Sequence, residues 1–306
     1  MNEQRRGVVF GATAYIIWGA FPLYFPLLQP AGAWEILGHR ILWSLVVAVA
    51  FVFVVGRRTQ VAAVLRDRRK LALLAAAATV ISINWVTYIW GVSNGRIVET
   101  SLGYFTNPLV TMLMGVIILR ERMRKLQWVA LGIAFVAVVV LTIDYGRLPW
   151  VALILAFSFG TYGLLKKSAG VGPFESLAVE TAVTAPFALA FIVALQATGH
   201  GTLVGHGAGH VLLLVSLGIA TVVPLACFGA AAIRVPMVTI GLLQYLAPIL
   251  QFAVGVFIAH EAMPPGRWAG FAIVWIALVI FSAEAVHHRR KVLRAARAAA
   301  VTPTTA

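Results

Sequence analysis

Charged side chains are scarce in this sequence, and acidic ones most of all. Its 306 residues include 10 Asp or Glu and 24 Lys or Arg, so that 11% of the chain is charged. Soluble domains carry about 25% charged residues, and so few could not cover a chain that is 61% hydrophobic. The composition excludes a soluble globular protein. A mean hydropathy of +0.93 predicts a protein of the lipid bilayer.

Motifs for cofactors, metals and enzymatic chemistry are also missing. The single cysteine, Cys227, has no partner for an intrachain disulfide. Pro264 stands where the pair His260-Glu261 would need a second metal-binding histidine. With no phosphate loop or nucleotide fingerprint, we expect no cofactor, no metal, no enzyme and no ATP-driven pump. The net charge of +14 lies in short clusters between apolar runs, which argues against nucleic acid as a partner.

Long apolar runs are what the sequence has instead. A membrane-spanning helix needs about 20 largely apolar residues, and punctuating Pro, Gly and charged residues divide the chain into ten such runs. The sequence therefore predicts an all-α membrane protein with ten transmembrane helices, at residues 7–28, 35–55, 71–93, 97–119, 126–143, 149–165, 173–196, 210–233, 236–259 and 267–286.

The basic residues predict the orientation of these helices, because positively charged loops stay in the cytoplasm. With the N-terminus inside, the outer loops hold three of the 24 Lys and Arg residues, namely Arg96, Arg147 and Arg267. Arg40 lies within a span, and the other 20 fall on the inner side. Both termini are therefore expected in the cytoplasm.

The sequence overlays itself when it is displaced by 140 residues, the spacing between Pro108 and Pro248. The matches include Glu121 with Glu261 and Trp128 with Trp268. Each copy holds five spans, so the second copy enters the membrane from the opposite face. We therefore expect a 5+5 inverted-topology repeat, with halves at 1–147 and 148–288 and a basic cytoplasmic tail at 289–306. Such repeats are typical of secondary transporters, although duplication also occurs in membrane proteins without transport.

Polar residues line up on corresponding faces of the fourth and ninth spans. Tyr104 and Asn107 share a helix face with two threonines, and Gln244 and Gln251 occupy the equivalent face in the second half. Pro108 and Pro248 are candidate hinges, because each leaves the carbonyl four residues earlier without a donor. These residues either line a substrate cavity or bond helices together. The candidate cavity residues also include Asn84 and Tyr88 of the third span.

Three charged residues at membrane depth are further candidates for substrate binding or gating. Arg40 and Glu180 occupy equivalent positions in the two halves. Glu99 is the expected partner of Arg40 near the outer surface, unless Arg40 instead snorkels to that surface. Glu180, expected to pair with Lys166, Lys167 or Arg234, is the candidate for proton coupling.

Several segments resemble the RarD-type branch of the EamA family, in the drug/metabolite transporter superfamily. They are AYIIWGAFPLYF, EILGHRILWS, ETSLGYFTNPL, RERMRKLQW, TVVPLACFGAA and QYLAPIL. The resemblance implies ten spans in a 5+5 repeat, with the fifth and tenth at the periphery. It also implies a place in a bacterial inner membrane and export or exchange of small metabolites or drugs. The branch name is linked to chloramphenicol sensitivity.

We expect a permease that works by alternating access, coupled to protons, with a small molecule as substrate and membrane lipids as partners. The alternatives are a flippase for lipids or lipid-linked compounds and a membrane scaffold or enzyme without transport. Whether the chain assembles with itself is left open.

Overall fold

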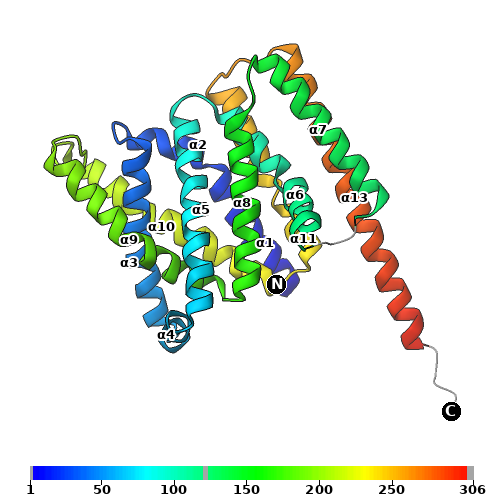
Figure 1. Cartoon of the computed structure of the whole chain (residues 1–306), viewed down its shortest axis with the longest axis horizontal. Helices are drawn as coiled ribbons and strands as arrows, with labels where there is room; N and C mark the ends of the chain where they lie inside the picture. Colours follow the sequence, from blue (N-terminus) through cyan, green and yellow to red (C-terminus); the bar gives the residue numbers. More distant parts are fainter. Residues whose placement is uncertain (1–2, 120–122, 302–306) are drawn as a thin grey trace.

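The computed structural model describes residues 3–119 and 123–301, and within these residues it holds helices and no strands (Figure 1). Nine segments of this part of the chain are long and apolar enough to cross a membrane. The protein is therefore an all-α membrane protein. Its elements are α1 (Glu3–Gly19), α2 (Phe21–Tyr24), η1 (Phe25–Leu28), α3 (Ala33–Val54), α4 (Arg58–Arg66), α5 (Arg68–Ser93), α6 (Ile97–Leu119), α7 (Lys125–Tyr145), α8 (Trp150–Ala169), α9 (Pro173–Ala197), α10 (Gly207–Ala232), α11 (Met237–Leu243), α12 (Leu246–Ala253), η2 (Val254–Ile258) and α13 (Pro265–Val301).

Helix α8, the expected sixth span, is not among these nine segments. It is 20 residues long and therefore long enough to span. Lys166 and Lys167 in its last turn, with Thr161 and Tyr162 before them, lower its hydropathy. It packs against α5 and α6 within the bundle. The count of ten spans stays a prediction.

Two expected spans are broken rather than continuous, which corrects the sequence prediction. Residues 7–28 form α1, α2 and the short helix η1, because Pro22 and Pro26 lack the N–H that a continuous helix requires. Residues 236–259 form α11, α12 and η2, with a turn at Gln244. These interruptions place backbone groups inside the bundle without their usual intrahelical partners.

The candidate hinge prolines behave differently from one another. Pro248 is the third residue of α12, and the chain turns just before it, at Gln244 and Tyr245. Helix α6, in contrast, continues through Pro108 to Leu119. The proline of the second half, Pro248, therefore lies next to a helix break. The proline of the first half, Pro108, lies within an unbroken helix.

Two helical segments lie outside the predicted spans. The first is α4, a short amphipathic helix, after which Asp67 caps α5 by accepting hydrogen bonds of 3.1 Å from the N–H groups of Arg69 and Lys70. The hydrogen bond from the backbone N–H of Lys70 lowers the pKa of the Asp67 carboxyl. The second is the continuation of α13 to Val301, so most of the expected basic tail is helical.

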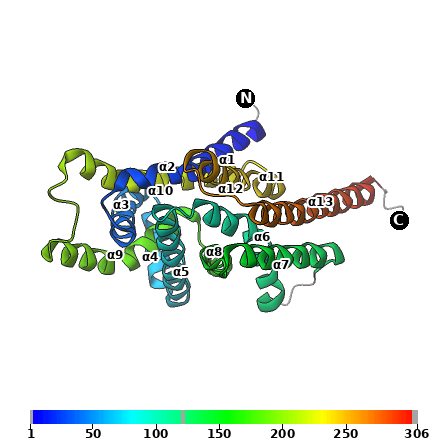
Figure 2. The same ribbon diagram turned by 90° about the horizontal axis from the view of Figure 1, so that it is seen from above.

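The helices form two layers when the molecule is seen from above (Figure 2). Helices α10, α1 and α12 lie in one layer, and α9, α5, α8 and α7 lie in the other. Helix α3 contacts both α9 and α10, and α6 contacts both α8 and α12, so these two helices connect the layers. Helices α7 and α13 pack side by side at one edge, the peripheral position that the resemblance implied for the fifth and tenth spans (Figures 1 and 2).

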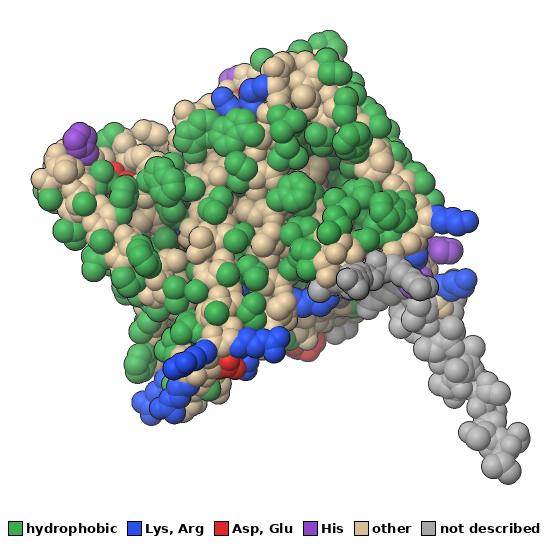
Figure 3. Space-filling view, viewed as in Figure 1, with side chains coloured by type: hydrophobic (Ala, Val, Ile, Leu, Met, Phe, Trp, Pro, Cys, Tyr) green, Lys and Arg blue, Asp and Glu red, His purple; other side chains and the backbone are tan. Residues whose placement is uncertain are grey.

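The surface is divided into a basic end and a hydrophobic face, as is typical of a membrane protein. Lys and Arg gather at the end where α4 lies, and hydrophobic side chains cover much of the face above it (Figure 3). Large apolar side chains such as Phe53, Phe135 and Phe187 are more than 60% exposed, which water would not tolerate in such number. The bilayer therefore supplies the solvent for this surface. The chain is a multi-pass membrane protein.

Candidate functional site

Arg40 lies in the interior of the bundle, surrounded by aromatic rings. Its guanidinium carbon is 4.1 Å from the ring centroid of Trp85 on α5 and 5.4 Å from that of Phe21 on α2. Its Nε donates a hydrogen bond of 3.0 Å to Thr221 Oγ1 on α10. The side chain of Arg40 is 4% exposed. Snorkelling to the surface is therefore not how this arginine is accommodated.

A glycine permits the close approach of helices that this hydrogen bond needs. Gly218 lies one turn before Thr221 on α10, and a Cβ at this position would collide with the backbone of Trp43 on α3. Small residues let membrane helices approach closely enough for side chains to hydrogen-bond across the interface. The pair Gly218 and Thr221 thus brings α10 within reach of Arg40.

Among the described residues, Arg40 has no acidic partner within 4 Å, and Thr221 alone accepts a hydrogen bond from it. The expected pairing with Glu99 is wrong. Glu99 instead contacts Arg147, with 2.6 Å between Oε2 and Nη2, and accepts a hydrogen bond of 3.1 Å from the N–H of Val151. Hydrogen bonding to Glu99 raises the pKa of Arg147. Isolated charges at membrane depth are costly, and the terminal nitrogens of Arg40 can therefore pair with an anionic group.

Three of the predicted cavity residues come together beside Arg40. The hydroxyl of Tyr104 donates to Asn84 Oδ1 at 3.1 Å, and Asn84 Nδ2 donates to the carbonyl of Leu155 at 3.0 Å. Tyr88 packs edge-on against Tyr104 with 5.5 Å between ring centroids. Its buried hydroxyl has no hydrogen-bond partner among the described residues. Tyr88 and Tyr104 both lie within electrostatic range of Arg40.

The other predicted polar residues lie away from this centre. Asn107 accepts a hydrogen bond of 3.3 Å from Thr111 on the same helix. Gln251 donates to the carbonyl of Trp18 at 3.2 Å, and its own carbonyl oxygen is buried without a partner in the described part of the chain. Gln244 caps α11 at the helix break. Gln251 therefore bonds α12 to α1, whereas Asn107 bonds within its own helix.

Glu180 forms a second polar centre, in which Lys166, one of its three expected partners, pairs with it. Lys166 Nζ lies 3.0 Å from Glu180 Oε1, and Tyr162 donates to Glu180 Oε2 at 3.1 Å. Lys166 also hydrogen-bonds to Ser176. Glu180 is the eighth residue of α9, as Arg40 is of α3, so each lies about 10 Å from the start of its helix.

Trp85 separates the two centres. One face of its ring holds the guanidinium of Arg40, and the ring also lines a crevice of about 10 Å³ that includes Glu180 and Thr184. A space of that size has room for a single water at most. Trp85 therefore contacts Arg40 and also borders the crevice at Glu180.

Carboxylates near helix ends bind neighbouring segments rather than a ligand. Glu35 at the start of α3 accepts from the N–H of Thr202 at 2.6 Å, and Glu175 at the start of α9 lies 2.6 Å from Arg57. Glu261 accepts hydrogen bonds from the first N–H groups of α6, where the helix dipole favours negative charge. Burial raises the pKa of Glu261, although these N–H groups oppose the shift. Its repeat counterpart Glu121 lies outside the described residues.

The residues that sequence reasoning missed are those whose role depends on helix packing. Thr221 is a lone hydroxyl in an apolar run, and nothing local distinguishes it from other threonines. Trp85 and Phe21 belong to aromatic-rich stretches that suit ordinary packing equally well. Tyr162 offered a signal, since it precedes Lys166 by four residues and must share its helix face.

Comparisons with known proteins identify relatives of this chain. The EamA-like transporter family matches residues 5–143. "Protein RarD" of Streptomyces exfoliatus is 54% identical over 303 residues, covering 99% of this chain and 96% of that protein. "Uncharacterized transporter YojE" of Bacillus subtilis (strain 168) is 39% identical over 292 residues, with 94% and 97% covered. A solved crystal structure, 18% identical, shares the fold with a TM-score of 0.59 over 90% of this chain and 96% of that one.

Proposed function

Since this chain belongs to the RarD-type branch of the EamA-like transporter family, we propose that it is a secondary transporter that exports or exchanges small metabolites or drugs by alternating access. Membership of this family makes the chain a membrane transporter. Its substrate, its coupling and its mechanism are proposed here. The observation that carries it is the buried guanidinium of Arg40, which has no acidic partner among the described residues.

The surroundings of Arg40 favour a particular class of substrate. A carboxylate or another anionic group would pair with the terminal nitrogens of Arg40, and the unpartnered hydroxyl of Tyr88 would supply a further hydrogen bond. The rings of Phe21 and Trp85 would contact an apolar or aromatic body. We therefore propose a small anionic or zwitterionic molecule with an apolar part.

Alternating access is supported by matching contacts in the two proposed halves. Glu35 reaches the loop after α9, and Glu175 reaches the loop after α3. Helix α1 packs on α10 as α8 packs on α5, as an inverted 5+5 repeat requires. The proposed motion rocks the halves 1–147 and 148–288 around the space between Arg40 and Glu180, where Trp85 lies.

Proton coupling is proposed for the pair Lys166 and Glu180. A buried ion pair whose members also bind hydroxyl groups can exchange its internal partner for a proton when the helices separate. Glu180 would then carry a proton in one conformation and bind Lys166 in the other. Arg40 and Glu180 occupy corresponding positions of α3 and α9, so the proposed substrate and proton sites would lie in opposite halves.

Counterflow in proteoliposomes tests the proposed substrate class. Purified protein is reconstituted, and uptake of radiolabelled aromatic and aliphatic amino acids, carboxylates and chloramphenicol is compared with and without a proton gradient. We expect uptake of at least one compound, and Arg40→Gln should lower it more than ten-fold. Arg96→Gln is the matched control, because Arg96 also stacks on a tryptophan, Trp90 at 4.9 Å, but near the end of α5.

Several outcomes would contradict the proposal. Equal transport by the Arg40→Gln and Arg96→Gln variants would remove Arg40 from the substrate site. Movement of fluorescent phospholipids between leaflets, without uptake of any soluble compound, would favour the flippase alternative. Absence of both activities in a correctly folded protein would favour a scaffold.

A further inference from the structure

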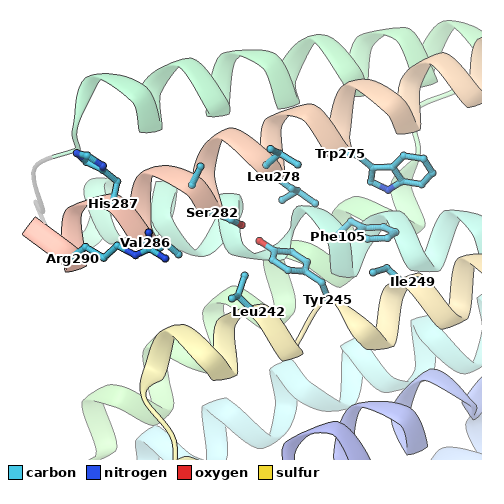
Figure 4. Close-up of a pocket in the computed structure, with 12 residues that line it drawn as sticks. Phe105, Leu242, Tyr245, Ile249, Trp275, Leu278, Ser282, Val286, His287 and Arg290 are labelled. Atoms are coloured by element: carbon cyan, nitrogen blue, oxygen red, sulfur yellow. The ribbon is translucent and has the colours of Figure 1, made fainter. Parts of the chain in front are cut away.

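A long groove runs along α13, on the opposite side of α6 from the Arg40 centre. It has a volume of about 750 Å³ and is bounded by α6, α11, α12 and α13. Phe105 of α6 lines the groove, whereas its neighbour Tyr104 bonds to Asn84 toward the centre. Figure 4 shows Trp275 at one end of the groove and His287 with Arg290 at the other.

The polarity of the groove changes along its length. From Trp275 to Val286 the lining residues of α13 are apolar apart from Ser282, whose hydroxyl faces that of Tyr245 (Figure 4). The next lining residues are His287 and Arg290, and both are exposed. Arg290 carries a positive charge. Among the described residues, Arg290 has no acidic partner within 4 Å.

The length of the apolar part corresponds to one leaflet of a bilayer. Trp275 and Val286 are eleven residues apart on a continuous helix, which is about 16 Å at 1.5 Å per residue. The hydrocarbon core of a bilayer is about 30 Å thick, so one leaflet spans about 15 Å. His287 and Arg290 therefore lie at the depth of lipid headgroups when Trp275 lies near the midplane.

We propose that this groove binds a glycerophospholipid with an anionic headgroup. One acyl chain lies along Phe105, Leu242 and Leu278, and the phosphate contacts Arg290 and His287. Basic pockets between transmembrane helices are a recognised form of site for anionic lipid headgroups. The site holds its lipid independently of transport, so this inference rests on the membrane placement of α13 and not on the proposed substrate.

The charge and shape of the groove favour a lipid over a second copy of the chain. A second copy would need an acidic side chain opposite Arg290 at the membrane surface, and the chain has ten acidic residues in all. Most acidic residues of the described chain are already held in ion pairs or by backbone N–H groups, as Glu284 is by Arg124 at 2.9 Å. An anionic glycerophospholipid supplies both: its phosphodiester carries the missing negative charge, and its acyl chain has the right length.

Native mass spectrometry of the detergent-purified chain tests this site. The protein is titrated with phosphatidylglycerol and with phosphatidylcholine carrying the same acyl chains. We expect tighter binding of phosphatidylglycerol, a roughly five-fold loss of that affinity in Arg290→Gln, and a further, smaller loss in the double variant with His287→Gln. Phosphatidylcholine binding should change little in these variants.

Two controls distinguish the groove from general surface charge. Arg58→Gln removes an exposed arginine at the start of α4, and His288→Gln removes the neighbour of His287 that does not line the groove. Neither should weaken phosphatidylglycerol binding by more than two-fold. Ser282→Trp, which fills the groove, should weaken the binding of both lipids.

The same measurements can overturn the proposal. An equal loss in Arg58→Gln and Arg290→Gln would mean a diffuse electrostatic effect. Competition by soluble glycerophosphate at the same concentrations would mean a phosphate site without an acyl chain, and a dimer that Ser282→Trp or Arg290→Gln dissociates would mean a protein interface. Arg40→Gln should leave lipid binding unchanged, so a failure of the proposed transport function would not affect this result.

Discussion

Arg40 of α3 and Thr221 of α10 are joined by a hydrogen bond of 3.0 Å that connects residues 181 positions apart in the chain. The bond crosses from the first proposed half to the second, and both side chains are buried. It is the one hydrogen bond that Arg40 makes to the described residues. The orientation of the guanidinium, and with it the position of any bound anion, therefore depends on this threonine.

Replacing Thr221 with valine should destabilise the protein and weaken substrate binding together. The change leaves the buried Nε of Arg40 without an acceptor, at a cost of about 1–3 kcal/mol. Thermal unfolding in detergent and the KM of counterflow would measure the two effects. Thr221→Ser should retain most of both, because it keeps the hydroxyl.

Thr181→Val is the matched control for that experiment. Thr181 is equally buried, but its hydroxyl bonds only within its own helix, to the carbonyls of Leu177 and Ala178. We expect a smaller loss of stability and an unchanged KM. An equal effect of the two valine substitutions on KM would show that Thr221 does not position Arg40.

Replacing Glu180 with glutamine should uncouple transport from the proton gradient while leaving exchange of substrate intact. The amide keeps the shape of the side chain and cannot carry a titrating proton. Proton movement would be followed with a pH-sensitive dye inside proteoliposomes. The control is Glu175, an equally buried carboxylate at the start of α9 that binds Arg57. Glu175→Gln should leave coupling unchanged. Normal proton movement in Glu180→Gln would exclude it as the coupling residue.

Lys166 and Glu180 should show mutual rescue. Lys166→Met alone leaves the buried carboxylate of Glu180 with Tyr162 as its remaining side-chain partner, a loss of about 3–5 kcal/mol for a buried pair. The double variant with Glu180→Gln removes both charges and should be more stable than Lys166→Met. Additive losses in unfolding experiments would contradict a direct pair.

Double-mutant cycles should assign Glu99 to Arg147 and not to Arg40. Glu99 and Arg147 form two hydrogen bonds, of 2.6 and 3.3 Å, and Arg147 is 35% exposed. Solvent screening limits the coupling expected from Glu99→Gln and Arg147→Gln to about 1 kcal/mol. The cycle with Arg40→Gln should give a coupling near zero. A larger coupling to Arg40 than to Arg147 would restore the gate that the sequence suggested.

The two edge helices offer a comparison of a shielded and a more exposed ion pair. Asp144 lies 3.1 Å from Arg267, and Arg124 lies 2.9 Å from Glu284. Arg267 is 17% exposed and also stacks on Tyr145 at 4.1 Å, whereas Arg124 is 39% exposed. A double-mutant cycle should therefore show stronger coupling for Asp144 and Arg267, about 1 kcal/mol or more. The opposite order would mean that burial does not set the strength of these pairs.

Helix placement, membrane location and family could be predicted from the chain alone, because each depends on local composition. Apolar runs bounded by charges and prolines located α3, α5, α6, α7, α9 and α10 to within a few residues. That Glu180 pairs with a cation at the inner ends of the spans was also predictable, although the sequence left Lys166, Lys167 and Arg234 open and the structure decides for Lys166. The motif segments placed the chain in its family before any contact was known.

The partner of Arg40 could not be predicted in the same way. Glu99 was the nearest available charge by depth, but depth does not say which helix faces meet. In the folded protein α10 packs closely against α3 at Gly218, so that Thr221 faces Arg40, while the loop before α8 brings Arg147 to Glu99. The breaks in the first and ninth spans likewise follow from how prolines are accommodated among neighbouring helices.

Composition and periodicity thus specify which segments become helices and that a bilayer surrounds them, because these properties are summed along the chain. The contacts of Arg40, among them the stacking on Trp85, and the groove beside α13 arise between residues far apart in sequence. Such contacts depend on the distances and rotations of whole helices, which small residues such as Gly218 set by allowing backbones to approach.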